Sequence, residues 1–496
     1  MYFLFGIYAL ALTFIAVYCS SQVILWLDYR KGKKGKGGFV NGKKSKAKLS
    51  ADLPFVTIQL PIFNELYVVE RLIDNMVKMN YPKDKFQIHI LDDSTDETVE
   101  VTRKKVNEYQ ALGFDIQQVT RTNRQGYKAG ALKEATHLAK GDLIAIFDAD
   151  FMPRPDFLLE TIPYFEDKKI GVVQTRWEHI NKEYSLLTKL QAMQLDVHFS
   201  VEQQGRFAGN SLLQFNGTAG VWRKQTIDDA GGWEADTLTE DLDLSYRAQV
   251  NGWQIIYLES VGSPAELPVE MNGLKSQQFR WMKGGAENAR KNLVRIWSSN
   301  IPLKKKINGT THLLNSTVFL AVLTAGITSV PLVFLLDGVN FPMAQYFLGL
   351  FVISTLAILL IYYEANVRAF FQEGSYSHRL GIFILYFPIF LALSMGLSFH
   401  NTVAVLEGWS GKKSAFIRTP KFNIQTFGDS FEGTKYVAQK ITWTTIFEAL
   451  LTLYFLFGFI AGIVVGNPAF LVFHGLLVIG FGTITFYTIL HLNKGN

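Results

Sequence analysis

Long apolar runs at both ends of the 496-residue chain limit what it can fold into. Residues 1–27 contain no Asp, Glu, Lys or Arg, and about 20 apolar residues suffice for a helix to cross a bilayer. Four further long apolar runs lie in the second half of the chain. The sequence therefore predicts an α-helical multi-span transmembrane domain, with a first transmembrane helix (1–27) and two transmembrane hairpins (313–363 and 442–491).

The segment after the first run sets the expected orientation. A cleaved signal peptide is the competing interpretation of residues 1–27, but the run lacks a basic start and is too long. Residues 28–51 are rich in Gly and Lys, with nine Lys or Arg between Arg30 and Lys48. Nucleic-acid binding is one interpretation of this segment, but contact with anionic membrane lipids beside a span is the more common one. The positive-inside rule then predicts that residues 28–51 are a basic cytoplasmic linker and that residue 50 onward lies in the cytoplasm. We also expect a plasma (inner) membrane location and no nucleic-acid partner.

A further apolar run, residues 381–406, leaves the number of membrane crossings open. If it crosses the membrane once, the segment 407–441 with its six Lys or Arg lies outside. We therefore expect residues 364–441 to hold an interfacial or re-entrant element, because non-helical backbone at membrane depth is tolerated where protein buries it. Residues 291–312 are expected to form an interfacial helix.

Residues 52–290 alternate between short β-rich runs and helical periodicity. This alternation predicts a mostly parallel sheet, an α/β arrangement in which ligands bind beyond the carboxyl ends of the strands. Acidic residues recur at those ends, namely Asp92, Asp93, Asp148 and Asp150. The expected strands are 55–61, 86–91, 114–120, 142–150 and 170–177.

Two motifs in this region favour binding of a phosphorylated ligand. Asp148 and Asp150 lie two apart at a strand end, and paired carboxylates suit a hard divalent cation such as Mg²⁺ or Mn²⁺. Turns or helix caps explain many such pairs, so the metal interpretation is one of two. Lys128, in GYKAGAL, follows a Gly at a helix start, which suits phosphate. The alternative is an ordinary helix N-terminus with an exposed lysine.

Two later motifs also have a structural and a functional interpretation. In TLTEDLDL, Thr239 as an N-cap with acidic residues after it accounts for a helix start. Alternatively, Asp241 points from the helix start into the cleft as a general base. Gln277, Arg280 and Trp281 form a Gln-x-x-Arg-Trp arrangement shortly before the apolar region. They either cap and anchor a helix, or they contact a molecule that then crosses the bilayer.

Six ordered motifs resemble those of the processive family-2 glycosyltransferases, most closely the cellulose synthase-like synthases of mannan, glucomannan or the xyloglucan backbone. The likeness covers roughly residues 55–290. It implies a GT-A fold, which is Rossmann-like, a nucleotide-sugar donor and a channel formed by the C-terminal spans. The motifs are LDDST, GYKAGALKEA, IFDADF, FNGTAGVWR, Thr-Glu-Asp at 239–241 and the Gln-x-x-Arg-Trp arrangement.

The resemblance also implies roles for individual residues. Asp241 corresponds to the catalytic base, and Asp150 with Asp148 to the metal ligands. Residues 416–421, FIRTPK, are similar to a gating-loop motif, with Arg418 where that motif has Val. The implied donor-binding residues are Asp92, Asp93, Lys128, Asp148 and Arg280; the acceptor-binding residues are Gln277, Trp281, Glu240 and Gly217; and the gating-loop residues are Phe416, Thr419 and Lys421.

The function implied by the resemblance is a membrane-embedded, inverting and processive hexosyltransferase. It would elongate a β-linked glucan or mannan on a growing glycan acceptor, from UDP-glucose or GDP-mannose, and translocate the product. A non-processive lipid glycosyltransferase of the ceramide, sterol or polyprenyl type is the alternative, because such enzymes share the Gln-x-x-Arg-Trp motif. A scaffold or transporter with a degenerate transferase domain is the alternative from another class.

Overall fold

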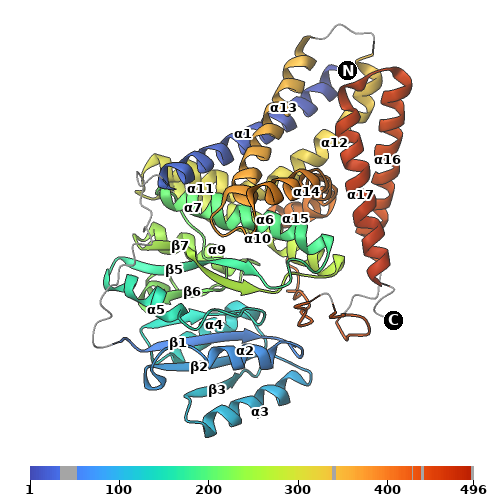
Figure 1. Ribbon diagram of the computed structural model, residues 1–496. Helices are drawn as coiled ribbons and strands as arrows, with labels where there is room; N and C mark the ends of the chain where they lie inside the picture. The colour runs from blue at the N-terminus through green and yellow to red at the C-terminus, as the bar shows by residue number, and fades with distance from the viewer. Residues whose placement is uncertain (34–52, 338–341, 427, 437–440, 493–496) are drawn as a thin grey trace.

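The computed structural model describes residues 1–33, 53–337, 342–426, 428–436 and 441–492. An α/β domain at one end of the molecule carries a group of long helices at the other (Figure 1). Its seven-stranded sheet has the order β3-β2-β1-β4-β6-β5-β7. The strands are β1 (Val56–Ile62), β2 (Phe86–Asp92), β3 (Ile116–Thr120), β4 (Leu143–Ile146), β5 (Ile170–His179), β6 (Gly220–Arg223) and β7 (Gln254–Ala265).

The sheet is mostly parallel, as the alternation in the sequence predicts. Strand β1 pairs in parallel with β2 and β4, and β5 pairs in parallel with β7. Strand β6 is antiparallel to both of its neighbours, β4 and β5. Every residue of β2 and β4 is buried, which is typical of strands covered on both faces. The helices that follow the strands are α2 (Val69–Met76), α3 (Thr98–Ala111), α4 (Tyr127–Leu138), α5 (Phe157–Thr161), α6 (Leu186–Val197), α7 (Gln203–Ala208), α8 (Lys224–Asp229) and α9 (Glu240–Val250).

A long helix, α10 (Met271–Ser298), joins the α/β domain to the apolar helices. The expected domain boundary at residue 290 falls inside this helix. The expected interfacial helix 291–312 is the end of α10 followed by α11 (Leu303–Leu313). Gly284 of this helix packs closely against Thr239, because a Cβ at position 284 would lie only 2.5 Å from the Thr239 Oγ1 atom.

The structure has six helices that are long and apolar enough to cross a membrane among its described residues. Helix α1 continues past residue 27, the expected end of the first span, as far as Lys33. The rest of the expected linker and the tip of the first hairpin, residues 338–341, lie outside the described residues. The six helices include α1 (Tyr2–Lys33), α12 (Val318–Leu335), α13 (Pro342–Tyr363), α14 (Tyr376–Gly396), α16 (Trp443–Val465) and α17 (Leu471–Leu492).

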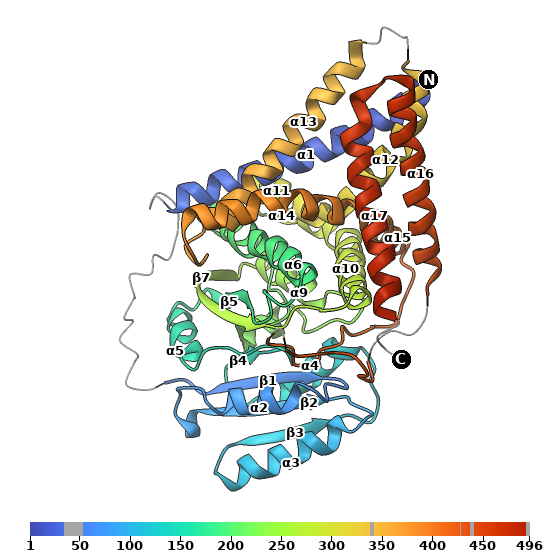
Figure 2. The same ribbon diagram turned by 45° about the vertical axis from the view of Figure 1, so that its right-hand side comes forward.

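The run 381–406 divides between two helices. Helix α14 ends at Gly396, and α15 (Ser398–Ser410) follows after a break at Leu397. Figures 1 and 2 show α14 lying across the direction of α16 and α17, at the level where the long helices meet the α/β domain. Its last residue packs on the backbone of Gly480 in α17. Helix α14 is also long enough to cross a membrane, so the interfacial interpretation stays a prediction.

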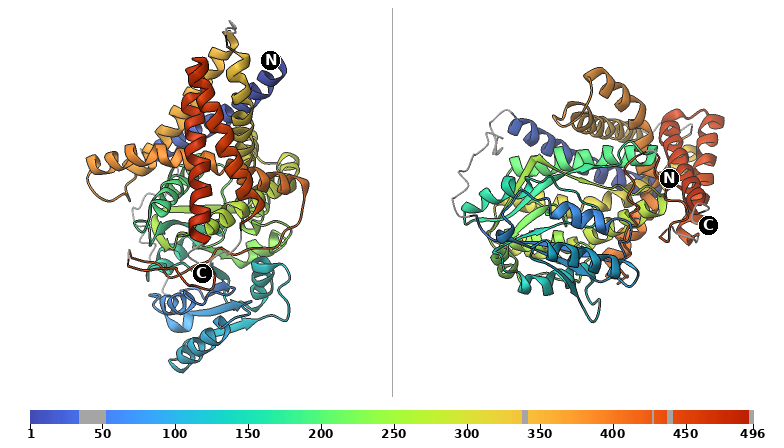
Figure 3. Two further views of the ribbon diagram at one scale, coloured as in Figure 1. Left: turned by 90° about the vertical axis from the view of Figure 1, so that its right-hand side faces the viewer. Right: turned by 60° about the horizontal axis from the view of Figure 1, so that its bottom comes forward.

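The positions of the helix ends indicate on which side of the long helices the segment between α13 and α16 lies. The N-terminus and the α16–α17 turn lie together, far from the α/β domain (Figures 1 and 3). The last turn of α13 and the first turn of α16 both lie toward that domain. The segment between them therefore begins and ends on the same side, as the interfacial interpretation requires.

A buried ion pair links α10 to α16. The Lys275 Nζ atom lies 2.7 Å from Glu448 Oε2, and the two side chains are 5% and 0% exposed. Removing one partner of such a pair costs about 3–5 kcal/mol, because the other charge stays buried. We expect Lys275→Met to lower the thermal unfolding temperature of the detergent-purified protein clearly, and Lys275→Met with Glu448→Leu to recover most of the loss. Lys133→Met on exposed α4 surface is the control. Equal losses in the single and double variants would contradict this role of the pair.

Candidate functional site

A cavity of about 520 Å³ lies between the carboxyl edge of the sheet and the long helices. This volume falls in the range of small-molecule sites. The cavity brings together almost all of the residues singled out from the sequence. Its lining includes Asp93, Lys128, Asp148, Asp150, Gly217, Glu240, Asp241, Gln277, Arg280, Trp281, Phe416, Thr419 and Lys421.

Lys128 lies at the first turn of α4 because the backbone turns sharply before it. Gly126 and Tyr127 both have left-handed φ values, 73° and 49°. The ammonium group forms an ion pair with Asp148 and donates to the Gly217 carbonyl at 2.9 Å. Of the two interpretations of Lys128, an exposed lysine is therefore wrong.

Asp150 is paired with a lysine from the other end of the chain. Both aspartates lie in the turn after β4, which ends at Ile146 rather than at the expected residue 150. The Lys421 Nζ atom lies 2.6 Å from Asp150 Oδ2 and 2.7 Å from the carbonyl oxygen of Glu266. Each carboxylate of the Asp-x-Asp motif therefore has its own cation, Lys128 for Asp148 and Lys421 for Asp150.

Glu65 is a member of this site that the sequence reasoning missed. It lines the same cavity, and its Oε2 atom accepts from Arg418 at 3.0 Å. Burial raises its pKa to about 8, against the lowering effect of Arg418. The available signal was its place shortly after β1, at the same edge of the sheet as the aspartates.

The two aspartates at the end of β2 have different surroundings. Asp93 lines the cavity and pairs with Arg121, whose Nε atom lies 2.9 Å from Asp93 Oδ1. Asp92 is buried at the strand end, where it accepts from Gln118 Nε2 at 2.7 Å and from the Ser94 backbone at 2.9 Å. These bonds hold Asp92 between strands β2 and β3, outside the cavity lining, whereas Asp93 lines the cavity.

Asp241 and Glu240 begin α9, and both are buried. Burial and the neighbouring charge of Glu240 raise the pKa of Asp241 to about 7. The expected cap at Thr239 is wrong in its detail, since this N-cap residue forms no side-chain capping bond. Its hydroxyl instead accepts from Asn288 of α10 at 3.0 Å. The start of α9 is thus fixed by α10, with Asp241 turned to the cavity.

Gly217 lies against Asp241. Its φ is +78°, and a Cβ added there would lie 3.1 Å from Asp241 Oδ2 and 3.4 Å from Lys128 Nζ. A side chain at this position would therefore fill the space beside the carboxylate, so glycine keeps that space open.

Helix α10 presents Gln277, Arg280 and Trp281 to the cavity. The Arg280 Nη2 atom donates to Thr419 Oγ1 at 2.8 Å, and its guanidinium lies 4.7 Å from the Phe416 ring centre. The Phe416 ring stacks on Tyr127 with centroids 5.9 Å apart. The segment 416–421 therefore lies inside the site, in contact with both α10 and the start of α4.

A second part of the cavity wall was not identified from the sequence. A single π-helical turn, η3 (His198–Glu202), follows α6, and such turns are often found at functional sites. His198, Glu202 and Asn216 line the cavity. The spacing of the histidines gives no metal-ligand signal, so only the fold reveals His198 as part of this wall.

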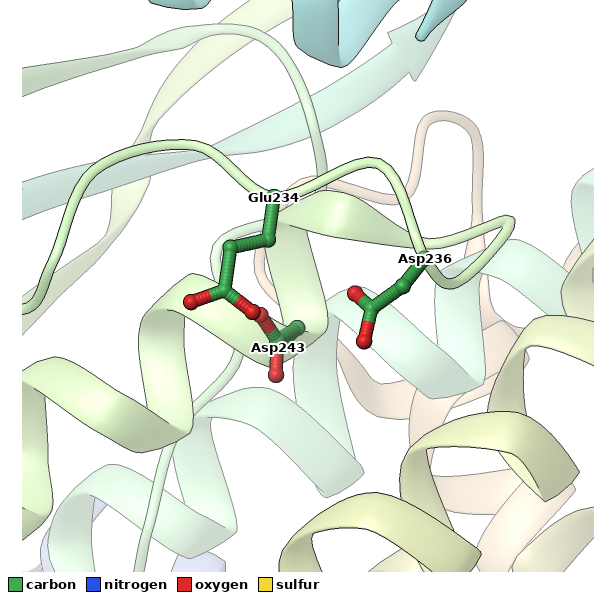
Figure 4. A group of neighbouring side chains, drawn as sticks. All are labelled: Glu234, Asp236 and Asp243. Atoms are coloured by element: carbon green, nitrogen blue, oxygen red, sulfur yellow. The ribbon is translucent and has the colours of Figure 1, made fainter.

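A cluster of three carboxylates lies outside the lining of the cavity. Figure 4 shows Glu234 and Asp236 converging on Asp243 of α9. Lys291 lies 2.6, 2.7 and 3.1 Å from these three carboxylates, in that order. The Lys291 ammonium lies among the three carboxylates, and Arg247 also pairs with Asp243 at 2.8 Å. The cluster is therefore an ion-pair network that ties α10 to α9.

Sequence comparison identifies the α/β domain. The family described as glycosyltransferase like family 2 matches residues 54–284. Residues 54–284, the family 2 domain, are similar to the members of this family. The family 2 domain contains the whole sheet, and its match ends in α10, just after Trp281.

Similar curated proteins are plant enzymes. The chain is 39% identical over 312 residues to probable glucomannan 4-beta-mannosyltransferase 4 of Oryza sativa subsp. japonica, covering 61% of this chain and 56% of that one. It is 38% identical over 319 residues to glucomannan 4-beta-mannosyltransferase 1 of Cyamopsis tetragonoloba, covering 63% and 60%. The chain thus spans less than two thirds of the length of these relatives. It resembles the cellulose synthase-like group, as the motifs indicate.

A solved structure supports the fold. Mannosyltransferase PcManGT from Pyrobaculum calidifontis, in complex with GDP-Man and Mn²⁺, has a TM-score of 0.56 at 18% sequence identity. The likeness covers 82% of this chain and all of that one. The family 2 domain therefore has the expected GT-A fold, and the six long apolar helices among the described residues indicate a multi-pass membrane protein.

The raised pKa of Asp241 gives a pH-dependent stability. Its pKa is about 7 in the folded protein, against 3.8 ordinarily. Between these values the folded state keeps a proton that the unfolded chain releases, so the free energy of unfolding falls as pH rises through this window. Asp241→Asn removes this titration. We expect the unfolding temperature of the variant minus that of wild type to be more positive at about pH 8.5 than at about pH 5. The exposed Asp228→Asn is the control, and a difference that does not change with pH would contradict the effect.

Proposed function

We propose that the chain is an inverting, processive hexosyltransferase that elongates a β-linked glycan of the mannan or glucomannan type from a nucleotide sugar. The observation that carries this proposal is one cavity that holds both Asp241 and the Lys128–Asp148 pair and that continues between the apolar helices. The names of the plant relatives and of PcManGT favour GDP-mannose over UDP-glucose as the donor.

The donor is proposed to lie along the carboxyl edge of β1, β2 and β4. Asp93 lines the end of the cavity nearest β2 and would contact the nucleoside. The fixed charge of Arg280 and the ammonium of Lys128 would meet the diphosphate, because cations placed where negative charge develops stabilise a departing group. This arrangement supplies charge to the leaving diphosphate without a protein acid.

The residues present fit a divalent cation at the Asp-x-Asp motif. Asp148 and Asp150 offer hard carboxylate oxygens beside Glu65, and the positions next to them already attract the ammonium groups of Lys128 and Lys421. We propose Mg²⁺ or Mn²⁺ there, held by Asp150 and Asp148. When bound, such an ion neutralises the diphosphate.

Asp241 is proposed to take the proton from the acceptor hydroxyl. Its pKa of about 7 is suited to a general base near neutral pH. Gly217 leaves space for the hydroxyl beside the carboxylate. Attack on the face opposite the leaving diphosphate inverts the anomeric carbon, so an α-linked donor gives a β-linked product.

The acceptor chain is proposed to leave through the membrane part of the cavity. Trp281, Gln277 and Glu240 lie where the terminal sugar would be held, and Trp281 offers an aromatic face to it. Beyond them the lining consists of residues from α1, α12, α13, α14 and α17, which supports translocation of the product. These residues include Ile15, Tyr18, Phe319, Val322, Phe351, Ser354, Phe390, Ser394 and Phe473.

The orientation follows from the same arrangement. We place the family 2 domain in the cytoplasm, where nucleotide sugars are made, and the chain in the plasma (inner) membrane in contact with its lipids. Arg30, Lys31 and Lys33 support this, since they end α1 on the side of the catalytic domain (Figure 1), and basic residues favour the cytoplasmic side.

The segment 416–421 is proposed to act as a gating loop. Its Thr419 and Phe416 contact Arg280, and its Lys421 contacts Asp150. An arriving diphosphate and its cation would compete for these same two partners. Donor binding would therefore rearrange the loop.

Replacing the base tests the proposal. We expect Asp241→Asn to lower sugar transfer by at least 10²-fold, the range that a positioned general base contributes. GDP or UDP affinity, measured by calorimetry, should stay within about threefold of wild type, because the base meets the acceptor rather than the nucleotide. The assay incubates purified protein with labelled GDP-mannose or UDP-glucose. His137→Asn on the exposed end of α4 is the control. Near-normal transfer by Asp241→Asn would contradict the assignment.

A further inference from the structure

The hairpin of α10 and α11 has an exposed face to which the reaction above gives no role. We propose that this face binds the headgroups of anionic phospholipids in the leaflet next to the family 2 domain. We name it the α10–α11 face, and its residues are Trp297, Leu303, Lys304, Lys306 and Ile307. The inference goes beyond the proposed reaction, and it depends only on the membrane placement of the apolar helices.

Three large apolar side chains of the α10–α11 face are exposed. Trp297, Leu303 and Ile307 are 49%, 61% and 49% exposed. Leu303 and Ile307 are four residues apart, so they lie on the same side of α11. The Trp297 Nε1 atom donates to Thr310 Oγ1 at 3.0 Å, which holds the indole ring beside α11. Neighbouring exposed side chains of this kind mark an interaction site, and tryptophan is enriched where a membrane meets water.

Lysines lie on both sides of the apolar pair. At 3.6 residues per turn, Lys304 and Lys306 lie on opposite sides of the line from Leu303 to Ile307. The Lys306 ammonium group donates to the Trp297 carbonyl at 2.9 Å, so it stays close to the apolar side chains. An apolar stripe with basic residues at its edges is typical of a helix that lies in the headgroup region of a membrane.

The end of α1 adds positive charge beside Lys304. The Lys304 Nζ atom lies 3.8 Å from Asp28 Oδ2, and the Lys31 Nζ atom lies 3.9 Å from Asp28 Oδ1. One carboxylate therefore serves two ammonium groups, and Arg30 lies in the same turn of α1. This local excess of positive charge complements lipid phosphate groups, and it favours anionic over zwitterionic lipids.

The α10–α11 face lies at the depth expected for headgroups. Figures 1 and 2 show α11 at the height of α14 and of the end of α1, where the long helices meet the family 2 domain. From α11 the chain continues through the short helix η4 (Asn315–Thr317) into the apolar helix α12. The face is therefore next to the part of the chain that enters the bilayer.

A second copy of this chain is the other occupant that an exposed apolar face would accept. In a twofold dimer the face would meet itself, because the same surface of each copy forms such an interface. The lysines at its edges would then approach those of the other copy, and like charges repel each other. The charge of the face therefore favours lipid phosphate as its partner.

Quenching of Trp297 fluorescence by brominated lipid tests this contact. The full-length protein is placed in nanodiscs of phosphatidylcholine and phosphatidylglycerol in equal amounts, with bromine on the acyl chains of one or the other. Trp297→Phe removes one of the nine tryptophans, so the difference between wild type and this variant is the Trp297 signal. We expect both lipids to quench this signal, and phosphatidylglycerol to quench it more strongly. Added salt should reduce this preference, because it screens exposed charges.

Charge variants assign the preference to the lysines. We expect Lys304→Gln or Lys306→Gln to lower the preference for phosphatidylglycerol by up to about fivefold, the factor for one basic residue at an anionic surface. Each variant is compared with its own Trp297→Phe double variant. The matched control is Lys104→Gln on the exposed side of α3, far from the apolar helices, which should leave the preference unchanged (Figure 1). The salt series on wild type needs no variant, so a variant that misfolds does not prevent the test.

Three results would overturn the inference. Equal quenching by the two lipids would indicate bilayer contact without a preference for anionic headgroups. An equal loss of preference in Lys104→Gln would indicate an effect of overall charge. A Trp297 signal that neither lipid quenches, in a protein that elutes as a dimer, would assign the face to a second copy. The assay contains no nucleotide sugar, so a protein that prefers phosphatidylglycerol but transfers no sugar would refute the proposed function alone.

Discussion

The site depends on charge compensation among carboxylates buried at the edge of a sheet. Removing a carboxylate from water costs several kcal/mol unless a cation is supplied close by. Here the cations come from distant parts of the chain. Lys128 meets Asp148, Lys421 meets Asp150 and Arg418 meets Glu65. These pairs join the first strand, the fourth strand, the start of α4 and the loop before α16 into one site.

Asp241 has a raised pKa like its buried neighbours Asp148 and Glu65, but in the described structure it lacks the cation with which each of them pairs. It lies instead beside another carboxylate, Glu240. Its proton is therefore held more tightly than that of an ordinary aspartate. A group that is easily protonated near neutral pH and faces open space suits the removal of a proton from a sugar hydroxyl.

Helix α10 connects the charged residues of the cavity to the apolar helices. One face of the helix lines the cavity with Arg280 and Trp281, and its other contacts fix both neighbours. Asn288 bonds to the start of α9, Lys283 lies 3.1 Å from Glu407 of α15, and Lys275 pairs with Glu448 of α16. The proposed catalytic base and the apolar helices are thus positioned by the same helix.

Much of the fold follows from local sequence pattern. Strands β1, β2 and β4 are short apolar runs that end in polar residues, and that pattern was enough to predict a mostly parallel sheet with acidic residues at one edge. Strands β6 and β7 were not identified. β6 is only four residues long and depends on antiparallel pairing with β4 and β5, which local pattern does not encode.

The sequence was enough to predict which residues belong to the site, but not which of them contact one another. Motif likeness selected Asp241, Arg280 and Lys421, and the structure brings them into one cavity. The pairing of each lysine with its aspartate depends on contacts between residues far apart in sequence, 271 positions in the case of Lys421 and Asp150. The turn that holds His198 is a π-helical interruption between α6 and α7, so its side chains change direction where helical periodicity predicts continuity.

The length of the product tests the central claim most directly. Purified protein in proteoliposomes would be incubated with radiolabelled GDP-mannose or UDP-glucose, and the product separated by size and digested with endo-β-1,4-mannanase or cellulase. The account predicts a polymer of many sugars that the matching glycanase degrades. A single sugar that is extracted into organic solvent with lipid would contradict it, because a transferase of that kind does not need a cavity that continues between membrane helices.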